Sequence, residues 1–155
     1  MRALRLAAIL LLVFATACAA PITLPKGFVE LRDGGQGYRA VTSDGARLRV
    51  RDLTEPTGGG VEFWTETLRL DLVQQRGYQQ IDAGEVKDAA GEPGQWLRFA
   101  ANVDGERFGF LVAVWSHDPW WPLASNYLRV VEFTAREEVF AAHVEAVQQA
   151  LATVR

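Results

Sequence analysis

The sequence predicts an α+β domain in which an antiparallel β-sheet of about five to six strands is flanked by two helices. The chain has 155 residues, of which 49% are hydrophobic and 23% charged, so it can bury one compact core. Segments in which apolar and polar residues alternate, separated by short glycine turns, indicate strands. Two longer segments with apolar residues every three to four positions indicate helices. The order is a hairpin, a helix, three or four antiparallel strands and a second helix.

The first element is a β-hairpin over residues 38–53, with its turn at Ser43-Asp44-Gly45. In the second arm apolar residues alternate with arginines, with Ala46, Leu48 and Val50 on one face and Arg47, Arg49 and Arg51 on the other. The apolar set is expected to face the core. The glycine-rich segment 54–60 then forms a connection.

A helix is predicted over residues 61–76. Trp64, Leu68 and Leu72 recur every fourth position, and a wider stripe is completed by Val61, Phe63, Leu70 and Val73. Gly77 supplies the C-terminal cap.

Four strands are expected next, over residues 78–87, 95–103, 107–115 and 127–133. The third is apolar on both faces, which is typical of a central strand covered on both sides. A final helix is predicted to begin at Thr134 with a capping box that ends at Glu137. Its apolar stripe consists of Phe140, Val144, Val147, Leu151 and Val154.

The N-terminus has the pattern of a secretory signal peptide over residues 1–17. Arg2 and Arg5 precede an apolar run over residues 6–14, which is about half the ~20 residues needed to span a bilayer. The following Ala15-Thr16-Ala17-Cys18 resembles a bacterial lipobox, although that family prefers leucine at the position of Ala15. The resemblance implies that Cys18 is lipidated and becomes the mature N-terminus.

Residues 18–27 would then form the lipidated end and a short tether, and residues 28–155 a single domain. Ala19 stands where an aspartate would indicate retention in the inner membrane, so the outer membrane is favoured. The alternative is ordinary cleavage after Ala17 or Ala19, which would give a soluble exported protein.

The packing and turn residues of the domain resemble the PsbP-like group, which includes small exported bacterial proteins and DcrB-type lipoproteins. The matching positions are Tyr38, Asp44-Gly45, Leu48, Phe63-Trp64, Leu68, Gly77-Tyr78, Val130-Val131-Glu132-Phe133 and the helix from Phe140 to Leu151. The resemblance implies an α/β/α sandwich and a role as an accessory or assembly factor. It carries over no catalytic residue.

Two features are candidate interaction sites. The first is Trp120 and Trp121, which lie between prolines in the loop 116–126. They could anchor a protein partner or insert among lipid headgroups, and the alternative is that they pack over the sheet edge. The second is the stripe Arg47, Arg49 and Arg51, which could meet lipid phosphates or a partner's carboxylates. The alternative is a solvent-facing strand paired with acids such as Glu30, Asp33 or Glu55.

The sequence gives little support for catalysis or metal binding. A serine hydrolase could use His117 and Asp118 with Ser116 or Ser125 as the nucleophile. The sequence, however, has neither a G-x-S-x-G elbow nor an S-x-x-K motif. The chain has two histidines and one cysteine, and that cysteine belongs to the signal region, so no metal site and no cofactor is expected. The net charge of −3 and the predicted export argue against a nucleic-acid partner.

We therefore expect a lipoprotein of the bacterial cell envelope, held to the membrane through Cys18, that acts as a non-catalytic interaction or assembly module with an envelope protein partner. The alternative is a carrier lipoprotein that binds a small ligand or lipid in an apolar pocket between the sheet and a helix. An enzyme is not expected.

Overall fold

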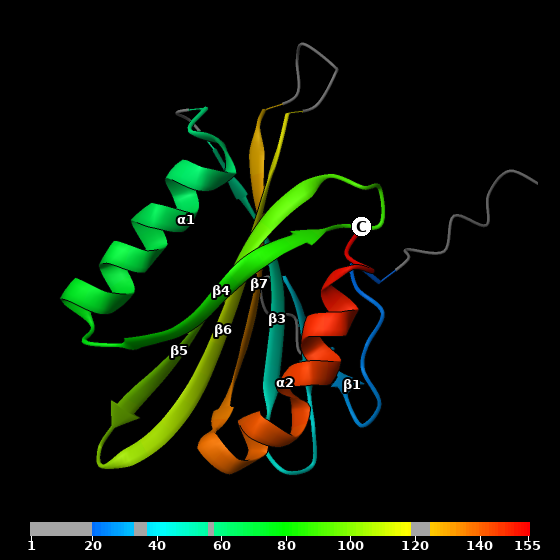
Figure 1. Ribbon diagram of the computed structural model, residues 1–155. Coiled ribbons are helices and arrows are strands. Elements are labelled where there is room, and N and C mark those ends of the chain that lie inside the picture. The colour runs from blue at the N-terminus through cyan, green and yellow to red at the C-terminus, as the bar shows by residue number, and fades with distance from the viewer. Residues whose placement is uncertain (1–19, 33–36, 56–57, 119–124) are drawn as a thin grey trace, which may run out of the picture.

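The computed structural model describes residues 20–32, 37–55, 58–118 and 125–155, which form a seven-stranded antiparallel sheet and two helices (Figure 1). The strands are β1 (Val29–Glu30), β2 (Tyr38–Val41), β3 (Arg47–Thr54), β4 (Gln79–Lys87), β5 (Pro93–Val103), β6 (Glu106–His117) and β7 (Tyr127–Arg136). The helices are α1 (Gly60–Leu70), which continues into the π-helical turn η2 (Asp71–Gln75), and α2 (Glu137–Leu151). The predicted α+β fold is confirmed, with somewhat more strands than expected. The additional β1 has two residues, too few for a recognisable alternation.

The order across the sheet is β1-β2-β3-β7-β6-β5-β4. After β3 the chain passes through α1 to the far edge of the sheet, and the strands β4 to β7 then return one by one. The last strand, β7, consequently pairs with β3, although α1 and three strands separate the two in the sequence. This pairing brings together residues about 80 positions apart, such as Arg49 and Glu132.

Two apolar cores lie on opposite faces of the sheet. Strand β6 contributes to both, as its apolar character on both faces predicts: Leu111, Ala113 and Trp115 face one core, and Val112 and Val114 face the other. The first core contains the buried side of α2, including Phe140, Val147, Leu151 and Val154. In the second core Leu72 is buried against the sheet, and Trp64, Leu68 and Val73 pack on it.

The apolar stripe of α1 is narrower than the sequence predicts. Phe63 is 52% exposed and Leu70 is 37% exposed, whereas Trp64 and Leu68 pack against the sheet. A helix turns by about 100° per residue, so a residue next to the buried row points along the sheet or away from it. The prediction that Phe63 and Leu70 belong to the buried stripe of the helix is therefore wrong, and both lie at the surface.

The predicted start of the second helix is also wrong. Thr134 belongs to β7, where its hydroxyl donates a hydrogen bond to the Gly109 carbonyl at 3.2 Å. The helix begins at Glu137, and its N-cap residue Arg136 makes no side-chain cap. Pairing with β6 extends the strand through the capping-box residues, because the tertiary hydrogen bonds outweigh the local signal.

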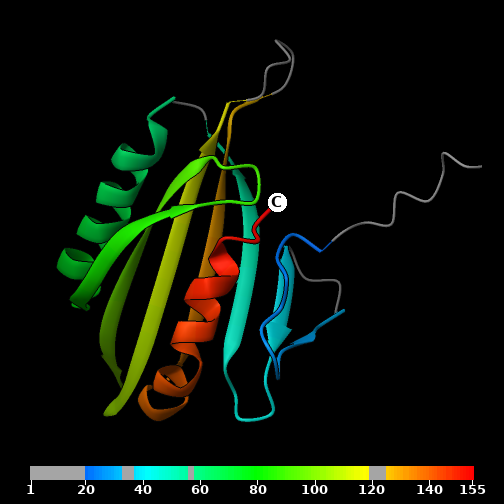
Figure 2. The same cartoon turned by 45° about the vertical axis from the view of Figure 1, so that its right-hand side comes forward.

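The N-terminal segment packs beside α2 and the C-terminus (Figure 2). The Arg155 N–H donates to the Pro21 carbonyl at 2.9 Å, and the Thr23 N–H donates to the Thr153 hydroxyl at 2.9 Å. Ile22 is 1% exposed within the α2 core. Residues 21–23 of the segment predicted as a tether thus pack against the domain.

Candidate functional site

Half of one sheet face carries no helix. Helix α1 packs mainly against β5 and β6, and α2 packs against β6 and β7 on the opposite side. On the α1 side, neither of the two helices of the described residues covers the surface of β2, β3 and the adjoining part of β7. We call this surface the arginine face, and it is formed by Arg39, Arg47, Arg49, Arg51, Glu132 and Thr134 together with Leu31, Val41 and Phe110.

Strand alternation and register place the charged side chains on this face. Leu48 and Val50 are buried in the core beneath α2, so the arginines between them project to the α1 side. Arg49 lies opposite Arg39 on β2 and opposite Glu132 on β7. The predicted alternation of arginines and core residues along β3 is confirmed by this arrangement.

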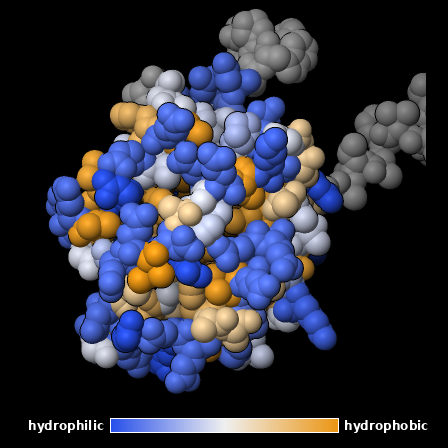
Figure 3. All heavy atoms as spheres, in the orientation of Figure 1, coloured by the Kyte–Doolittle hydropathy of each residue, from blue (hydrophilic) through white to orange (hydrophobic). Residues whose placement is uncertain are grey.

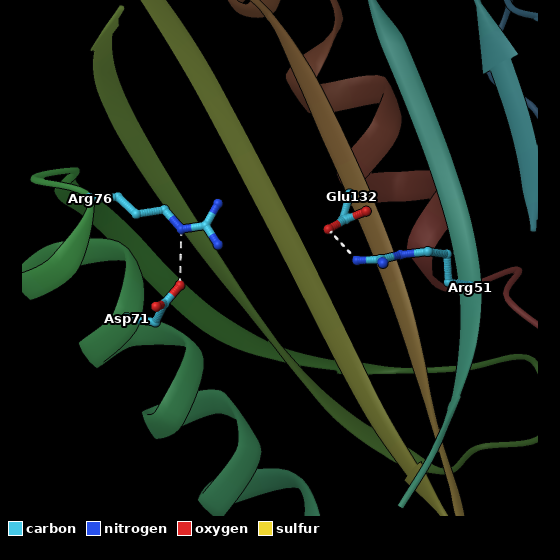
Figure 4. Close-up of polar contacts among 4 residues, drawn as sticks. All are labelled: Arg51, Asp71, Arg76 and Glu132. Carbon is cyan, nitrogen blue, oxygen red and sulfur yellow. Dashed lines mark hydrogen bonds and ion pairs between the residues drawn. The ribbon is translucent and has the colours of Figure 1, made fainter. Parts of the chain in front are cut away.

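The arginine face is hollowed rather than flat. It encloses a volume of about 630 Å³, lined by both charged and apolar side chains. The Arg51 guanidinium donates to Glu132 Oε1 at 2.7 Å, and the side chains are 30% and 25% exposed (Figure 4). Figure 4 shows this pair on one side of the strands, with α2 behind them.

The charge on this surface is predominantly positive. Among its described residues, four arginines accompany one carboxylate, that of Glu132. Arg47 is exposed and forms no ion pair with any described residue. The face is thus a concentration of cations in an otherwise acidic protein.

Two of the acids proposed from sequence as arginine partners, Glu30 and Glu55, have other contacts. Glu30 pairs with Arg32 at 3.3 Å, and Asp33 lies outside the described residues. Glu55 accepts hydrogen bonds from three donors, one of them at the start of α1. The partner of Arg51 is Glu132, which only the pairing of β3 with β7 brings close.

Glu55 is a buried carboxylate that joins α1 to the end of the sheet. It is 4% exposed, and its Oε1 accepts a hydrogen bond from the Trp64 indole at 2.8 Å. The Ser116 hydroxyl donates to Oε2 at 3.0 Å, and the Gly60 N–H donates to Oε1 at 3.3 Å. The Trp64 hydrogen bond, together with those from Ser116 and the start of the helix, lowers the pKa of Glu55 against the opposing effect of burial. The carboxylate therefore remains charged at neutral pH and fixes the N-terminus of α1.

Ser116 and His117, two of the residues that a hydrolase would use, have separate partners. Ser116 and His117 are successive residues of β6, so their side chains point to opposite faces of the sheet. Ser116 bonds to Glu55, and His117 stacks on Tyr127 with ring centroids 4.8 Å apart. Sequence proximity therefore does not place the serine hydroxyl against the imidazole.

The predicted tryptophan anchors and the predicted lipidation site lie outside the described residues. These are Trp120, Trp121 and Cys18. After this loop the described chain resumes at Ser125, and the Asn126 carbonyl accepts a hydrogen bond from the Glu55 N–H at 2.8 Å. Both predictions stay predictions.

His143 joins α2 to the β2–β3 turn. Its Nε2 lies 2.9 Å from Asp44 Oδ2, and its ring stands edge-on to Phe28. The Thr42 hydroxyl and His143 lower the pKa of Asp44. The contact gives this histidine a structural role in closing the hairpin against α2.

Over the described ranges, no group of three or more histidine, cysteine, aspartate or glutamate side chains is arranged to hold a metal ion. None of the helices in this part of the chain combines the length and the apolar character needed to cross a bilayer. On the side shown in Figure 3, hydrophobic residues are interspersed with hydrophilic ones.

A second hollow lies between α2 and the strands β4 to β6. It has a volume of about 320 Å³ and is lined chiefly by apolar residues, among them Ile81, Phe140, Ala141 and Val144. Arg98 and Arg107 stand at its border, where they pair with Asp82 and Glu137. This is the place between sheet and helix where a carrier function would need its pocket.

Comparison with known proteins identifies the fold. No family model and no curated protein matches the sequence. The structure is similar to that of LpqN from Mycobacterium tuberculosis, described as involved in cell envelope biogenesis, with a TM-score of 0.65 and 11% sequence identity over 84% of this chain and 78% of that one. It is also similar to PA94 from Pseudomonas aeruginosa, a protein of unknown function described as a putative regulator, with a TM-score of 0.59 and 12% identity over 83% of this chain and 80% of that one. At these identities the similarity establishes a shared fold, and the PsbP-like resemblance stays a prediction.

Proposed function

We propose that this chain is a lipoprotein of the bacterial cell envelope, anchored at Cys18, and that its domain is a non-catalytic interaction module. Its binding surface is the arginine face, with the loop that contains Trp120 and Trp121 as a second contact. The observation that carries the proposal is the open half-sheet, where a hollow of about 630 Å³ combines arginines with apolar side chains. The described role of LpqN in cell envelope biogenesis and the signal-like N-terminus support the envelope location.

The composition of the arginine face suits recognition better than stability. The Arg51–Glu132 pair is partly solvated, and such pairs contribute only about 0–1 kcal/mol to folding. Arg47 is exposed and contributes no ion pair with a described residue. Arginine is well suited to bidentate contacts with anionic groups, and it is enriched at protein interfaces.

The interaction is tested by photocrosslinking in intact cells. A photoreactive amino acid placed at Val41, inside the arginine face, should give discrete adducts, and Arg47→Glu in the same chain should abolish them. The matched control places the photoreactive group at Gln149, an exposed residue of α2 on the opposite side of the sheet. Equal adduct patterns from both positions, or adducts at Val41 that survive Arg47→Glu, would contradict the proposal.

The tryptophan contact is tested in the same cells. Replacing Trp120 and Trp121 together by alanine should weaken the adducts while the thermal stability stays unchanged. A large loss of stability would show instead that these rings are part of the core.

The anchor is tested separately. Replacing Cys18 by alanine should prevent acylation, which is measured by metabolic labelling with a fatty acid, and leave the precursor uncleaved. Several acyl chains give stable anchoring, because each buried CH₂ contributes about 0.8 kcal/mol. Normal processing of the alanine variant would indicate ordinary secretion and refute the lipid anchor at Cys18.

A carrier function is the second candidate, supported by the apolar hollow between α2 and β4 to β6. Its volume of about 320 Å³ lies at the low end of the range for small-molecule sites. Native mass spectrometry of gently purified protein should then detect a bound apolar compound. Val144→Trp, which fills the hollow, should abolish binding of that compound. Wild-type protein that carries no compound in any preparation would exclude a carrier function.

A further inference from the structure

We propose that the occupant of the arginine face is an extended acidic segment of a protein partner, whose alternate side chains carry carboxylates. This inference rests on the function proposed above and specifies the chemistry of the partner. It follows from the spacing of the arginines, the charge balance of the face, the apolar side chains beside it and the position of the anchor.

The spacing of the arginines matches an extended segment. Arg47, Arg49 and Arg51 project from alternate positions of β3, so their Cα atoms are about 7 Å apart. Alternate residues of any extended chain have the same spacing, and a segment that runs along β3 can therefore present one carboxylate to each guanidinium. A helix would repeat its matching positions at about 5–6 Å along its axis and would soon lose this register.

The exposed Arg47 favours an anionic occupant. Glu132 is the single carboxylate among the described residues of the face, and it accepts from Arg51. Arg47 stands exposed beside it without an ion pair to a described residue. Each guanidinium has five N–H donors, so an arginine that already has a contact can still bind an incoming carboxylate.

Apolar side chains border the row of arginines. Leu31 and Val41 lie toward the β1 edge, and Phe110 lies on β6 at the other border. Leu31 is 37% exposed although it is a large apolar residue. A partner segment with an apolar residue next to its acidic ones would cover this surface, whereas a soluble inorganic anion would leave it exposed.

The position of the anchor favours a protein over the membrane as the source of the carboxylates. Cys18 precedes Pro21 by three residues, so their Cα atoms are at most about 11 Å apart. Pro21 is bound to the C-terminus beside α2, and it borders Tyr38, Val50 and Arg129. Tyr38 and Val50 face the α2 core. A lipidated Cys18 thus holds the α2 side near the membrane, and the arginine face, on the other side of the sheet, points away from the phospholipid headgroups.

The test uses the full chain, purified from membranes in a nonionic detergent. The probe is a fluorescein-labelled heptapeptide with glutamate at its second, fourth and sixth positions, serine between them and leucine at both ends. Its fluorescence anisotropy is measured at low salt, where exposed charges are screened least. A second peptide with glutamine in place of glutamate has the same size and backbone but no negative side chain.

We expect the glutamate peptide to bind and the glutamine peptide to bind at least about tenfold more weakly. Arg47→Glu should lower the affinity for the glutamate peptide by a similar factor. The matched control is Arg107→Glu, which makes the same charge change at an exposed residue on the α2 side of the sheet and should leave binding unchanged. Equal binding of the two peptides, no binding of either, or equal effects of the two substitutions would overturn the inference.

A second measurement separates the protein from the membrane as occupant. An environment-sensitive dye on Val41→Cys reports on the arginine face after the full chain is reconstituted into phosphatidylcholine vesicles, with or without phosphatidylglycerol. We expect no change in emission with phosphatidylglycerol and a change when the glutamate peptide is added. A shift caused by phosphatidylglycerol would assign the face to anionic lipid and refute the inference.

Failure of this inference is distinguishable from failure of the proposed function. If the photocrosslinks at Val41 depend on Arg47 but the peptides do not bind, the interaction surface stands and the acidic segment is wrong. If the crosslinks are absent, the proposed function itself is wrong.

Discussion

Replacing Glu55 by alanine should detach the start of α1 from the sheet and destabilise the domain. The carboxylate accepts hydrogen bonds from the Trp64 indole at 2.8 Å, the Ser116 hydroxyl at 3.0 Å and the Gly60 N–H at 3.3 Å. It is 4% exposed, so water does not readily replace it as an acceptor. Alanine would leave these donors unsatisfied at a buried site.

The expected loss is about 3 kcal/mol in the free energy of unfolding. A hydrogen bond to a charged acceptor contributes about 1.5–3 kcal/mol, and the shortest of the three, from Trp64, measures 2.8 Å. Part of this is offset because the variant no longer buries a charge. A loss of this size lowers the melting temperature by about 10 °C in a domain of this length.

The assay is equilibrium unfolding in urea followed by far-UV circular dichroism and tryptophan fluorescence. Glu62→Ala is the matched control, because it removes an exposed carboxylate from the first turn of the same helix. Its effect should stay within about 0.5–1 kcal/mol. If Glu55→Ala costs less than about 1 kcal/mol, or no more than Glu62→Ala, the idea that Glu55 fastens the helix is refuted.

Three further predictions concern the pH response and the two cores. The pKa of Glu55 is lowered in the folded state, so the stability advantage of the wild type over Glu55→Gln should be present above about pH 4.3, the usual value, and shrink as the pH falls below it; an equal gap in urea unfolding at pH 7 and pH 3.5 would contradict this. Phe63→Ala, at a 52% exposed site, should cost less than about 1 kcal/mol, whereas Trp64→Ala should cost about 3 kcal/mol, and equal melting temperatures for the two variants would disprove the corrected face of α1. Gly109→Ala would place its Cβ against the Phe140 ring and should cost about 1–3 kcal/mol by thermal unfolding, so a fully stable variant would show that α2 does not pack tightly on β6.

Elements with a clear local pattern are predicted well from the sequence. The short connection between the strands predicted over residues 95–103 and 107–115 is one example, since Asp104 and Gly105 have positive φ values, 53° and 82°, and link β5 to β6 directly. The central strand β6 is another, because only a strand covered on both sides is apolar on both faces. In each case the information lies within about ten neighbouring residues.

Features that depend on distant neighbours are not predicted. The arginine stripe on β3 is visible in the sequence, but nothing local indicates that Glu132 is the acid opposite it. Glu55 was considered as an arginine partner and instead binds Trp64 and Ser116, which come from α1 and β6. A charge selects its partner by proximity in space, and no periodicity in the sequence encodes that distance.

The sequence by itself determined the fold class, the face of β3 that carries the arginines and the residues of the α2 core, because side-chain periodicity reflects which face of each element meets water. Two features depend on the tertiary structure alone: β7 lies beside β3, and α1 packs mainly on β5 and β6. Both features depend on the order of the strands in the sheet. That order depends on how the two cores pack at the same time, which no single segment encodes. For this reason the arginines can be read in the sequence, whereas the open hollow around them is a property of the folded sheet.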